Sequence, residues 1–287
     1  DGDFLDLVWE TTHLSSQTSP IVILLHGLAG SIESKYAKGL LRALAEQGWR
    51  ALLMHFRGCS GVPNRLDRSY HSGETEDIHY VIHHLHQRFP NAPMAAVGIS
   101  LGGNVLLKWL AEIKDNSPLT TAVAVSVPFE LAKLADHMQT GFARFYQWYL
   151  LKKMLRDIKQ KYTKRPAPID LTQVNAIHSF WRFDHLITAP LHGFKDAHDY
   201  YHQSSSRQYL RYITTPTLLI HAKGDPFMTP DVIPVETDLS QSVTLELSER
   251  GGHVGFITGD KLNKPMYWLE QRVPEFIKQI LQEGQSA

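Results

Sequence analysis

Cysteine, net charge and long apolar runs are all scarce in this sequence, and each shortage excludes a class of protein. The single cysteine, Cys59, cannot form a disulfide within the chain and favours a reducing, cytoplasmic setting. Lys and Arg number 29, as do Asp and Glu, so no general attraction to nucleic acid is expected. Apolar runs such as Ile21–Leu25 are too short to cross a bilayer, which argues against stable membrane insertion.

The composition that remains is that of a globular protein. Hydrophobic residues make up 43% of the 287 residues and charged residues 20%. This length is enough to bury the core of a single domain that carries an insertion. The chain opens at Asp1 without an initiator Met, which indicates a processed or truncated chain.

Short apolar strands alternate with amphipathic helices at both ends of the sequence. The expected strands are 4–9, 21–25, 51–55, 94–98, 122–127, 217–221 and 243–247, and the expected helices are 36–44, 78–85, 102–113 and 273–280. Such alternation predicts an α/β fold in which a mostly parallel sheet is covered by helices on both faces.

The alternation stops between residues 129 and 211, where no buried strand is evident. This part is rich in aromatic residues and contains a basic stretch, 152–165. We interpret it as a helical cap inserted into a core domain formed by residues 1–128 and 212–287. The basic stretch is better read as a solvated face than as a membrane-binding one. The aromatics are better read as helix core than as the lining of an acyl pocket.

The most informative motif is Gly98-Ile99-Ser100-Leu101-Gly102, a G-x-S-x-G sequence. A predicted strand precedes it and a predicted helix follows, as a nucleophile elbow requires. Glycines on either side relieve the crowding of so sharp a turn. The motif therefore predicts Ser100 as a nucleophile exposed above the sheet.

A serine hydroxyl needs an adjacent base, and chain order selects the candidates. In this fold the acid and then the histidine follow the serine. His253 lies in a glycine-rich loop after the last predicted strand, and Asp225 follows the strand before that one. We predict His253 as the base and Asp225 as the acid that orients it. Glu130, after the strand that ends at Val127, stays open as an alternative acid.

Backbone amides near the serine are expected to stabilise a developing oxyanion. One is the amide of Leu101, directly after the nucleophile, and the other is the Leu28 amide in the loop His26–Gly30. His26, Arg57 and Phe227 are expected to border the pocket. The chemistry requires neither metal nor cofactor.

Two further groups of residues invite a functional reading. His79, His83, His84 and His86 lie on one predicted helix, but no acidic or cysteine partner completes a metal site, so a solvated face is favoured. Cys59 lacks a base of its own, so a structural role is favoured over a reactive thiol.

Six segments together resemble one branch of the α/β-hydrolases. They are His26–Gly30, Phe56–Gly61, Tyr70–Asp77, Gly98–Asn104, Asp225–Phe227 and Gly251–Phe256. The branch is the bacterial predicted-hydrolase group related to eukaryotic abhydrolase-domain lipid esterases and yeast medium-chain fatty acid ethyl ester synthase/esterases. The resemblance spans nearly the whole chain and is weakest across the insertion.

The resemblance implies carboxylic ester hydrolysis, with Ser100, Asp225 and His253 matching the triad motifs. We expect a small-molecule ester with an apolar, short- to medium-chain or lipid-like acyl group. Acyl transfer to an alcohol, peptidase activity and a non-catalytic binding protein with the same fold stay open as alternatives. Dehalogenase chemistry is disfavoured because it needs a carboxylate in place of Ser100.

Overall fold

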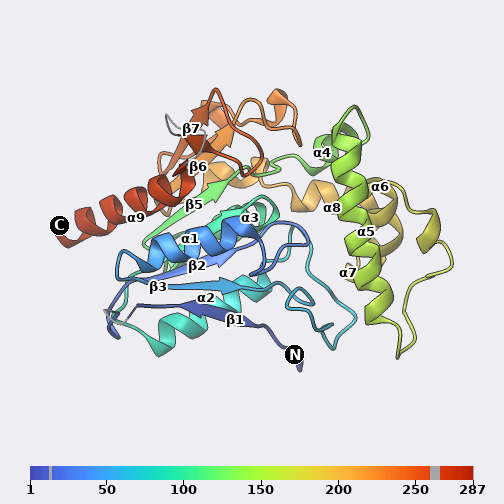
Figure 1. The fold of residues 1–287 in the computed structure, drawn as a ribbon, viewed down its shortest axis with the longest axis horizontal. Coiled ribbons are helices and arrows are strands. Elements are labelled where there is room, and N and C mark those ends of the chain that lie inside the picture. Colours follow the sequence, from blue (N-terminus) through green and yellow to red (C-terminus); the bar gives the residue numbers. More distant parts are fainter. Residues whose placement is uncertain (13–14, 259–265, 287) are drawn as a thin grey trace.

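The computed structural model describes residues 1–12, 15–258 and 266–286, and a twisted sheet runs through its centre (Figure 1). The seven strands that the described residues contribute to this sheet lie in the order β1-β3-β2-β4-β5-β6-β7. Their bounds are Leu7–Glu10 (β1), Ile21–Leu25 (β2), Arg50–Met54 (β3), Met94–Ile99 (β4), Thr121–Val125 (β5), Thr217–Ala222 (β6) and Val243–Ser248 (β7). All neighbours pair in parallel except β1, which pairs antiparallel with β3.

Helices cover both faces of the sheet, as the alternation predicts. Those of the α/β part are α1 (Lys35–Ala45), α2 (Glu76–Arg88), α3 (Leu101–Ile113) and α9 (Leu269–Ser286). Apolar side chains of α2 and α3 pack in one cluster against the sheet, and those of α1 and α9 pack in a second. Every residue of β2 is buried, because helices cover both of its sides.

The segment between β5 and β6 is helical, and it lies at the carboxyl edge of the sheet. It contains α4 (Leu131–His137), α5 (Ala143–Lys161), α6 (Phe180–Phe183), a π-helix (Asp184–Thr188), α7 (Ala189–His192) and α8 (Ala197–Ser204). Figure 1 shows these helices to the right of the sheet, beyond the carboxyl ends of the parallel strands. They share an apolar cluster of their own.

Short elements complete the described structure. They are the 3-10 turns Lys114–Asn116, Val174–Ala176, Arg207–Tyr212, Pro230–Val232 and Glu236–Asp238, and the small hairpin of β8 (Ile257–Thr258) with β9 (Met266–Tyr267). The sequence patterns do not predict the hairpin, whose strands have two residues each and no periodicity to read. Among the helices described, none is long and apolar enough to span a membrane.

The basic stretch of α5 is not a uniformly solvated face, and that expectation is wrong for Lys161. Its side chain is buried, and its ammonium donates to the carbonyl oxygens of Asp67 and Arg68 and to the hydroxyl of Ser69. Burial lowers the pKa of Lys161 to about 8. This lysine therefore ties the helical segment to the loop that leads into α2.

Candidate active site

Ser100 occupies a sharp turn between β4 and α3. Its backbone is left-handed, with φ 53° and ψ −118°, and its amide donates to the carbonyl of Val125 on the next strand at 2.8 Å. A non-glycine residue holds this strained conformation only when its surroundings enforce it. The turn carries the hydroxyl above the carboxyl edge of the sheet.

Two glycines make the turn sterically possible. A Cβ on Gly98 would lie 2.6 Å from the Gly102 carbonyl oxygen, and a Cβ on Gly102 would lie 2.5 Å from the Leu25 carbonyl oxygen. Real Cβ atoms do not approach backbone oxygens so closely. The glycines of the motif are therefore required by close packing between β2, β4 and the start of α3.

The structure brings Ser100, His253 and Asp225 together from three distant parts of the chain. His253 Nε2 lies 2.8 Å from the Ser100 hydroxyl, and His253 Nδ1 lies 2.8 Å from Asp225 Oδ2. Because the carboxylate can only accept, Nδ1 carries the proton and Nε2 is left to accept one from serine. The Asp225 side chain is 1% exposed and that of His253 12% exposed, so the acid is the more deeply buried of the two.

Phe227 holds the imidazole from its open side. The two rings stack with centroids 4.1 Å apart and an interplanar angle of 13°. The other carboxylate oxygen of Asp225 accepts the Phe227 amide at 2.9 Å. The turn that carries the acid thus also fixes the ring that packs on the base. Phe227 contacts His253 and does not line the main cavity.

Glu130, the alternative acid, lies elsewhere in a separate ion-pair group. Its carboxylate is 2.5 Å from the Arg207 guanidinium and 3.1 Å from the Lys133 ammonium. Arg207 also pairs with Asp238 at 2.9 Å. Geometry therefore favours Asp225 as the partner of His253, since Asp225 is the residue within hydrogen-bond distance.

The loop after β2 holds its amides in a specific arrangement. The Gly27 amide donates to the Tyr36 hydroxyl at 2.8 Å, and the Ala29 amide donates to the Tyr70 hydroxyl at 2.9 Å. Between them, the Leu28 amide has no hydrogen-bond acceptor among the described residues. A Cβ on Gly27 would lie 3.3 Å from the Ser100 Cβ, which shows how closely this loop approaches the serine. A free amide beside the hydroxyl is what an oxyanion hole needs.

A lysine of α5 fixes the same loop from the opposite side. The Lys153 ammonium donates to the carbonyl oxygen of Ala29, whose own φ of 53° is left-handed. The positive charge is near enough to help lower the pKa of His26, although burial is the larger cause. Sequence reasoning places Lys153 only within a basic stretch, and no motif distinguishes it from its neighbours.

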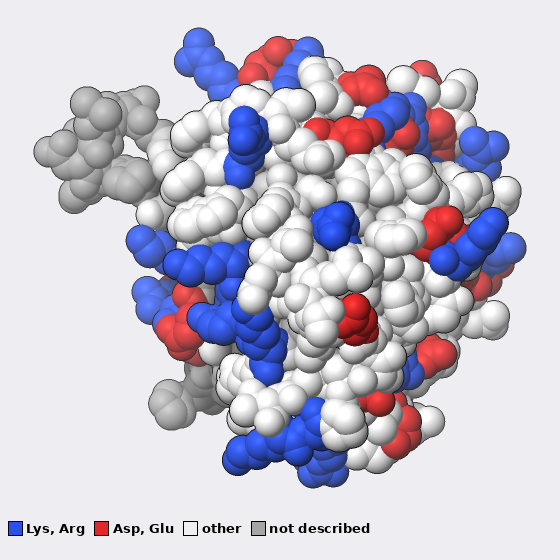
Figure 2. Space-filling view, turned by 90° about the vertical axis from the view of Figure 1, so that its right-hand side faces the viewer, with Lys and Arg blue, Asp and Glu red and all other residues white. Residues whose placement is uncertain are grey.

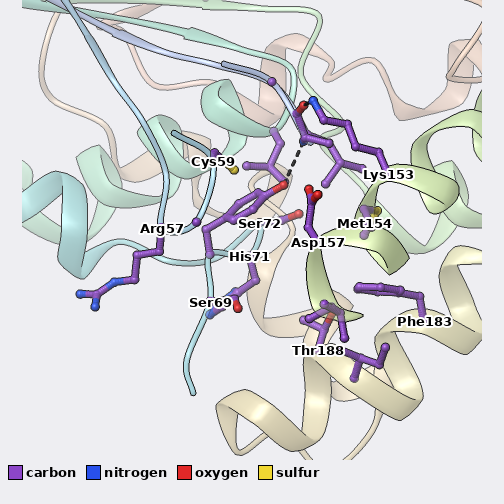
Figure 3. Close-up of a pocket in the computed structure, with 18 of the residues that line it drawn as sticks. Arg57, Cys59, Ser69, His71, Ser72, Lys153, Met154, Asp157, Phe183 and Thr188 are labelled. Carbon is purple, nitrogen blue, oxygen red and sulfur yellow. Dashed lines mark hydrogen bonds between the residues drawn. The ribbon is translucent and has the colours of Figure 1, made fainter. Parts of the chain in front are cut away.

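A cavity of about 510 Å³ lies beside the loop after β2 and the start of α3 (Figure 3). Both Leu28 and Leu101 line it, whereas the three triad side chains do not. The insertion supplies much of the wall; Figure 3 shows Met154, Asp157 and Phe183 extending into this space.

Of the other expected pocket residues, His26 is not in the pocket. It is fully buried, its Nδ1 donates to the Gly27 carbonyl at 2.8 Å, and its Nε2 accepts the Phe56 amide at 3.2 Å. Burial lowers the pKa of His26 to about 3, so the ring is neutral. His26 therefore supports the loop after β2 from within the core.

Arg57 borders the cavity, but its guanidinium turns away from it (Figure 3). It forms ion pairs with Asp77 at 2.6 Å, Asp1 at 2.8 Å and Asp3 at 2.9 Å. Only 6% of its side chain is exposed. Arg57 thus ties the amino-terminal segment to α2. Its charged group does not point into the cavity, which it borders with its backbone and the aliphatic part of its side chain.

Cys59 also lines the cavity, where burial raises the pKa of its thiol to about 12. A thiol that is protonated at neutral pH is a poor nucleophile.

The histidines of α2 form no metal site with neighbouring groups among the described residues. One of them, His79, accepts a hydrogen bond from the Trp109 indole at 3.3 Å. Within the described ranges, no three His, Cys, Asp or Glu side chains are grouped so that they hold a metal ion.

Comparisons with known proteins identify the family. The family model of the alpha/beta hydrolase fold matches residues 20–260. The Escherichia coli protein YheT, whose name describes it as a candidate esterase, is 47% identical over 98% of this chain and 83% of its own. Phospholipase ABHD3 of Mus musculus is 28% identical, over 99% of this chain and 71% of its own.

The fold comparison points the same way. The Pyrococcus furiosus esterase Pf2001 superimposes with a TM-score of 0.60 at 17% identity, covering 98% of this chain and 92% of that one. Identity this low establishes the fold alone. The chain therefore belongs to the alpha/beta-hydrolase fold family, and its relatives place it among the carboxylic ester hydrolases of that family.

Proposed function

We propose that this chain is a serine hydrolase that cleaves carboxylic esters through an acyl-enzyme on Ser100. One observation carries the proposal. A continuous hydrogen-bonded path runs from the Ser100 hydroxyl through His253 to the buried Asp225, with both contacts at 2.8 Å. Such a path gives a serine hydroxyl the base that it needs to act as a nucleophile at neutral pH.

In the first half of the reaction, the enzyme is acylated. His253 Nε2 takes the Ser100 proton while Oγ attacks the ester carbonyl carbon. The amides of Leu28 and Leu101 donate to the oxyanion that develops on the carbonyl oxygen. Asp225 stabilises the imidazolium ion. The carbon–oxygen bond to the alcohol then breaks, and the alcohol leaves with the proton from His253.

In the second half, water releases the acid. His253 removes a proton from a water molecule, which attacks the acyl carbon of the Ser100 ester. The same two amides stabilise the second oxyanion. When it collapses, Ser100 leaves and regains its proton from His253. Each group therefore returns to its starting state, and neither a metal nor a cofactor takes part.

The cavity supports an apolar acyl group of short to medium length. It adjoins the oxyanion amides, and its wall includes Met154, Ile158, Phe183, Ile187 and Leu191. A cavity of about 510 Å³ is within the range of small-molecule sites. Relatives named as a phospholipase and as a monoacylglycerol lipase support lipid-like esters as the substrate class.

The division of the chain is part of the same proposal. The core domain, residues 1–128 and 212–287, carries the triad and both amides. The cap, residues 129–211, closes the cavity over them. Residues of both parts line the cavity, which is what a substrate-selecting cap requires.

Hydrolysis of p-nitrophenyl esters from acetate to palmitate tests the proposal. Wild type should show a rate maximum at one chain length, and Ser100→Ala should abolish turnover at every length. The matched control is Ser126→Ala, at the end of the neighbouring strand, where the serine is buried and has a similar φ of 52°. Equal near-background rates for wild type and Ser100→Ala would contradict ester hydrolysis.

Covalent labelling separates the remaining readings. A fluorophosphonate should label wild type at Ser100 and should not label Ser100→Ala. Labelling without hydrolysis would direct attention to acyl transfer, which should then yield a new ester when an alcohol competes with water. A folded wild-type protein that resists the probe would contradict the serine-nucleophile proposal.

A further inference from the structure

One side of α5 exposes a row of aromatic rings, which we call the aromatic face. Phe142 is 72% exposed, Phe145 57%, Trp148 56% and Tyr149 58%. Their spacing of three, three and one residues places them along one side of the helix and its first turn. None of the four lines the cavity. Clustered exposed apolar side chains are uncommon on monomeric proteins and mark interaction sites.

The aromatic face is connected to the catalytic histidine by ring contacts. Phe142 and Phe145 contact Tyr146 with centroids 5.5 and 6.3 Å apart. Tyr146 contacts Phe227 at 4.8 Å, and Phe227 stacks on His253 at 4.1 Å. The exposed rings are therefore separated from His253 by two intervening rings, those of Tyr146 and Phe227, so a surface that covers them lies on the same side of the molecule as the proposed site.

The same segment carries a strong excess of positive charge. From residue 142 to 165 it has eight Lys or Arg residues against one acid, Asp157. The exposed basic residues are Arg144, Lys152, Arg156, Lys159 and Lys164. The Lys152 ammonium lies 5.3 Å from the centre of the Trp148 ring. In Figure 2, which views this side of the molecule, a broad and mostly uncharged area is interrupted by isolated basic and acidic side chains and is bordered at the left and below by Lys and Arg.

We propose that the aromatic face docks on the surface of a bilayer that contains anionic phospholipids. Trp, Tyr and Phe favour the boundary between headgroups and acyl chains, and Lys and Arg beside them attract lipid phosphates. Docking there places the ester site against a reservoir of lipid esters. This inference rests on the proposed function only for the benefit of docking, which is access to lipid esters. The aromatic face itself lies outside the proposed catalytic residues.

Charge also decides against a second copy of this chain as the occupant. A symmetric dimer through the aromatic face would place the exposed basic residues of one copy opposite those of the other. Like charges across an interface repel, whereas an anionic lipid surface neutralises them. The excess of eight basic residues over one acid therefore favours lipid.

Co-sedimentation with vesicles tests the proposal on the full chain. The vesicles are phosphatidylcholine alone and phosphatidylcholine with about one third phosphatidylglycerol, a composition chosen to supply the surface charge that basic residues sense. Wild type is compared with Phe145→Ser/Trp148→Ser and with Lys152→Gln/Lys159→Gln. The control, Tyr80→Ser/Tyr212→Ser, removes two aromatics that are 66% and 50% exposed on other elements.

Wild type and the tyrosine control should bind the anionic vesicles alike. The aromatic variant should bind at least about tenfold more weakly, and the lysine variant should lose its preference for anionic over neutral vesicles. All variants should hydrolyse soluble p-nitrophenyl acetate at the wild-type rate, since none of the changed residues touches the triad or the cavity.

Unchanged vesicle binding by the aromatic variant would overturn the proposal. So would a wild-type dimer, seen by sedimentation velocity, that the aromatic variant abolishes without any effect on vesicle binding. Ser100→Ala keeps the two proposals apart, because it should dock as wild type does while losing hydrolysis. Docking without Ser100-dependent hydrolysis would contradict the proposed function alone, and hydrolysis without docking would contradict this inference alone.

Discussion

The strands of the parallel sheet and the helical insertion differ in the side chains that they bury, and we expect the two regions to have different roles. Strands β2 and β4 are buried throughout and consist of aliphatic residues and glycine, so that the polar catalytic groups appear only where the strands end. Polar groups are buried in both regions, among them His26 and Asp225 in the sheet region and Lys161 and Thr188 in the insertion. Lys161 donates to two carbonyls, and His192 Nδ1 lies 2.7 Å from the Thr188 carbonyl.

The contrast shows where precision is required. The triad atoms must be held to a fraction of an ångström, and the rigid carboxyl edge of a parallel sheet provides this. The insertion meets this region through several hydrogen bonds, and one of them, from Lys153 to the Ala29 carbonyl, acts on the loop that follows β2. We therefore expect changes in the sheet region to act on rate or folding, and changes in the insertion to act mainly on substrate choice.

The largest effect is expected at the acid of the triad. Asp225→Asn should lower kcat by about 10³- to 10⁴-fold, because the amide cannot hold the imidazole in the tautomer that accepts the serine proton. Ester hydrolysis measures this. The matched variant is Glu130→Gln, in the acidic group that pairs with Arg207. A large loss in Glu130→Gln with activity kept in Asp225→Asn would reverse the assignment.

The next effect concerns the packing that forms the elbow. Gly102→Ala should destabilise the protein by about 3 kcal/mol, since its Cβ would meet backbone oxygens that have no room to move. Urea unfolding measures the free energy. Gly255→Ala is the control, because a Cβ there meets nothing within 4 Å. Equal stability of the two variants would show that the elbow is less tightly packed than the structure indicates.

Acid should weaken the sheet region through His26. The unfolded chain binds a proton on this imidazole below about pH 6.5, whereas the buried ring, with its pKa near 3, stays neutral. Stability therefore falls as the pH drops through this window, by about 2 kcal/mol between pH 7 and pH 5.

Urea unfolding at the two pH values tests this. His26→Gln should shrink the difference between them by that amount, whereas His84→Gln, on the exposed side of α2, should leave it as in wild type. An undiminished pH difference in His26→Gln would assign the acid sensitivity to other groups.

The smallest effect is expected at Lys153, which lies where the insertion contacts the sheet region. It therefore tests the comparison of the two regions most directly. Lys153→Met should lower kcat about tenfold with KM little changed, since it frees the loop that carries the Leu28 amide. Lys153→Arg should recover part of the loss. Lys152→Met, one residue away and exposed, should hydrolyse soluble esters as wild type does. A change in KM alone would make Lys153 a residue of the substrate wall.

The sequence by itself determined the α/β class, the order of the main strands and helices and the sharp turn at Ser100 between β4 and α3. These follow from local patterns. The strands are continuous apolar runs, the helices have one apolar side, and the G-x-S-x-G sequence stands between a strand and a helix. The first strand was expected at 4–9 and forms at Leu7–Glu10, because pairing with β3 sets its bounds.

Tertiary structure decided the rest, because it depends on residues far apart in the chain. The sequence predicts Asp225 as the acid and leaves Glu130 as an alternative, and only folding places Asp225 against His253 and Glu130 against Arg207. The sequence favours the helix core for the aromatics of the insertion, yet Phe142, just before α5, and three aromatics of α5 lie on the surface. Lys153 and Lys161 look alike in sequence, yet each finds its own carbonyl partners only when the insertion packs on the core. The sequence gives the side chains, but the contacts between residues far apart in the chain form only when the tertiary structure packs them together.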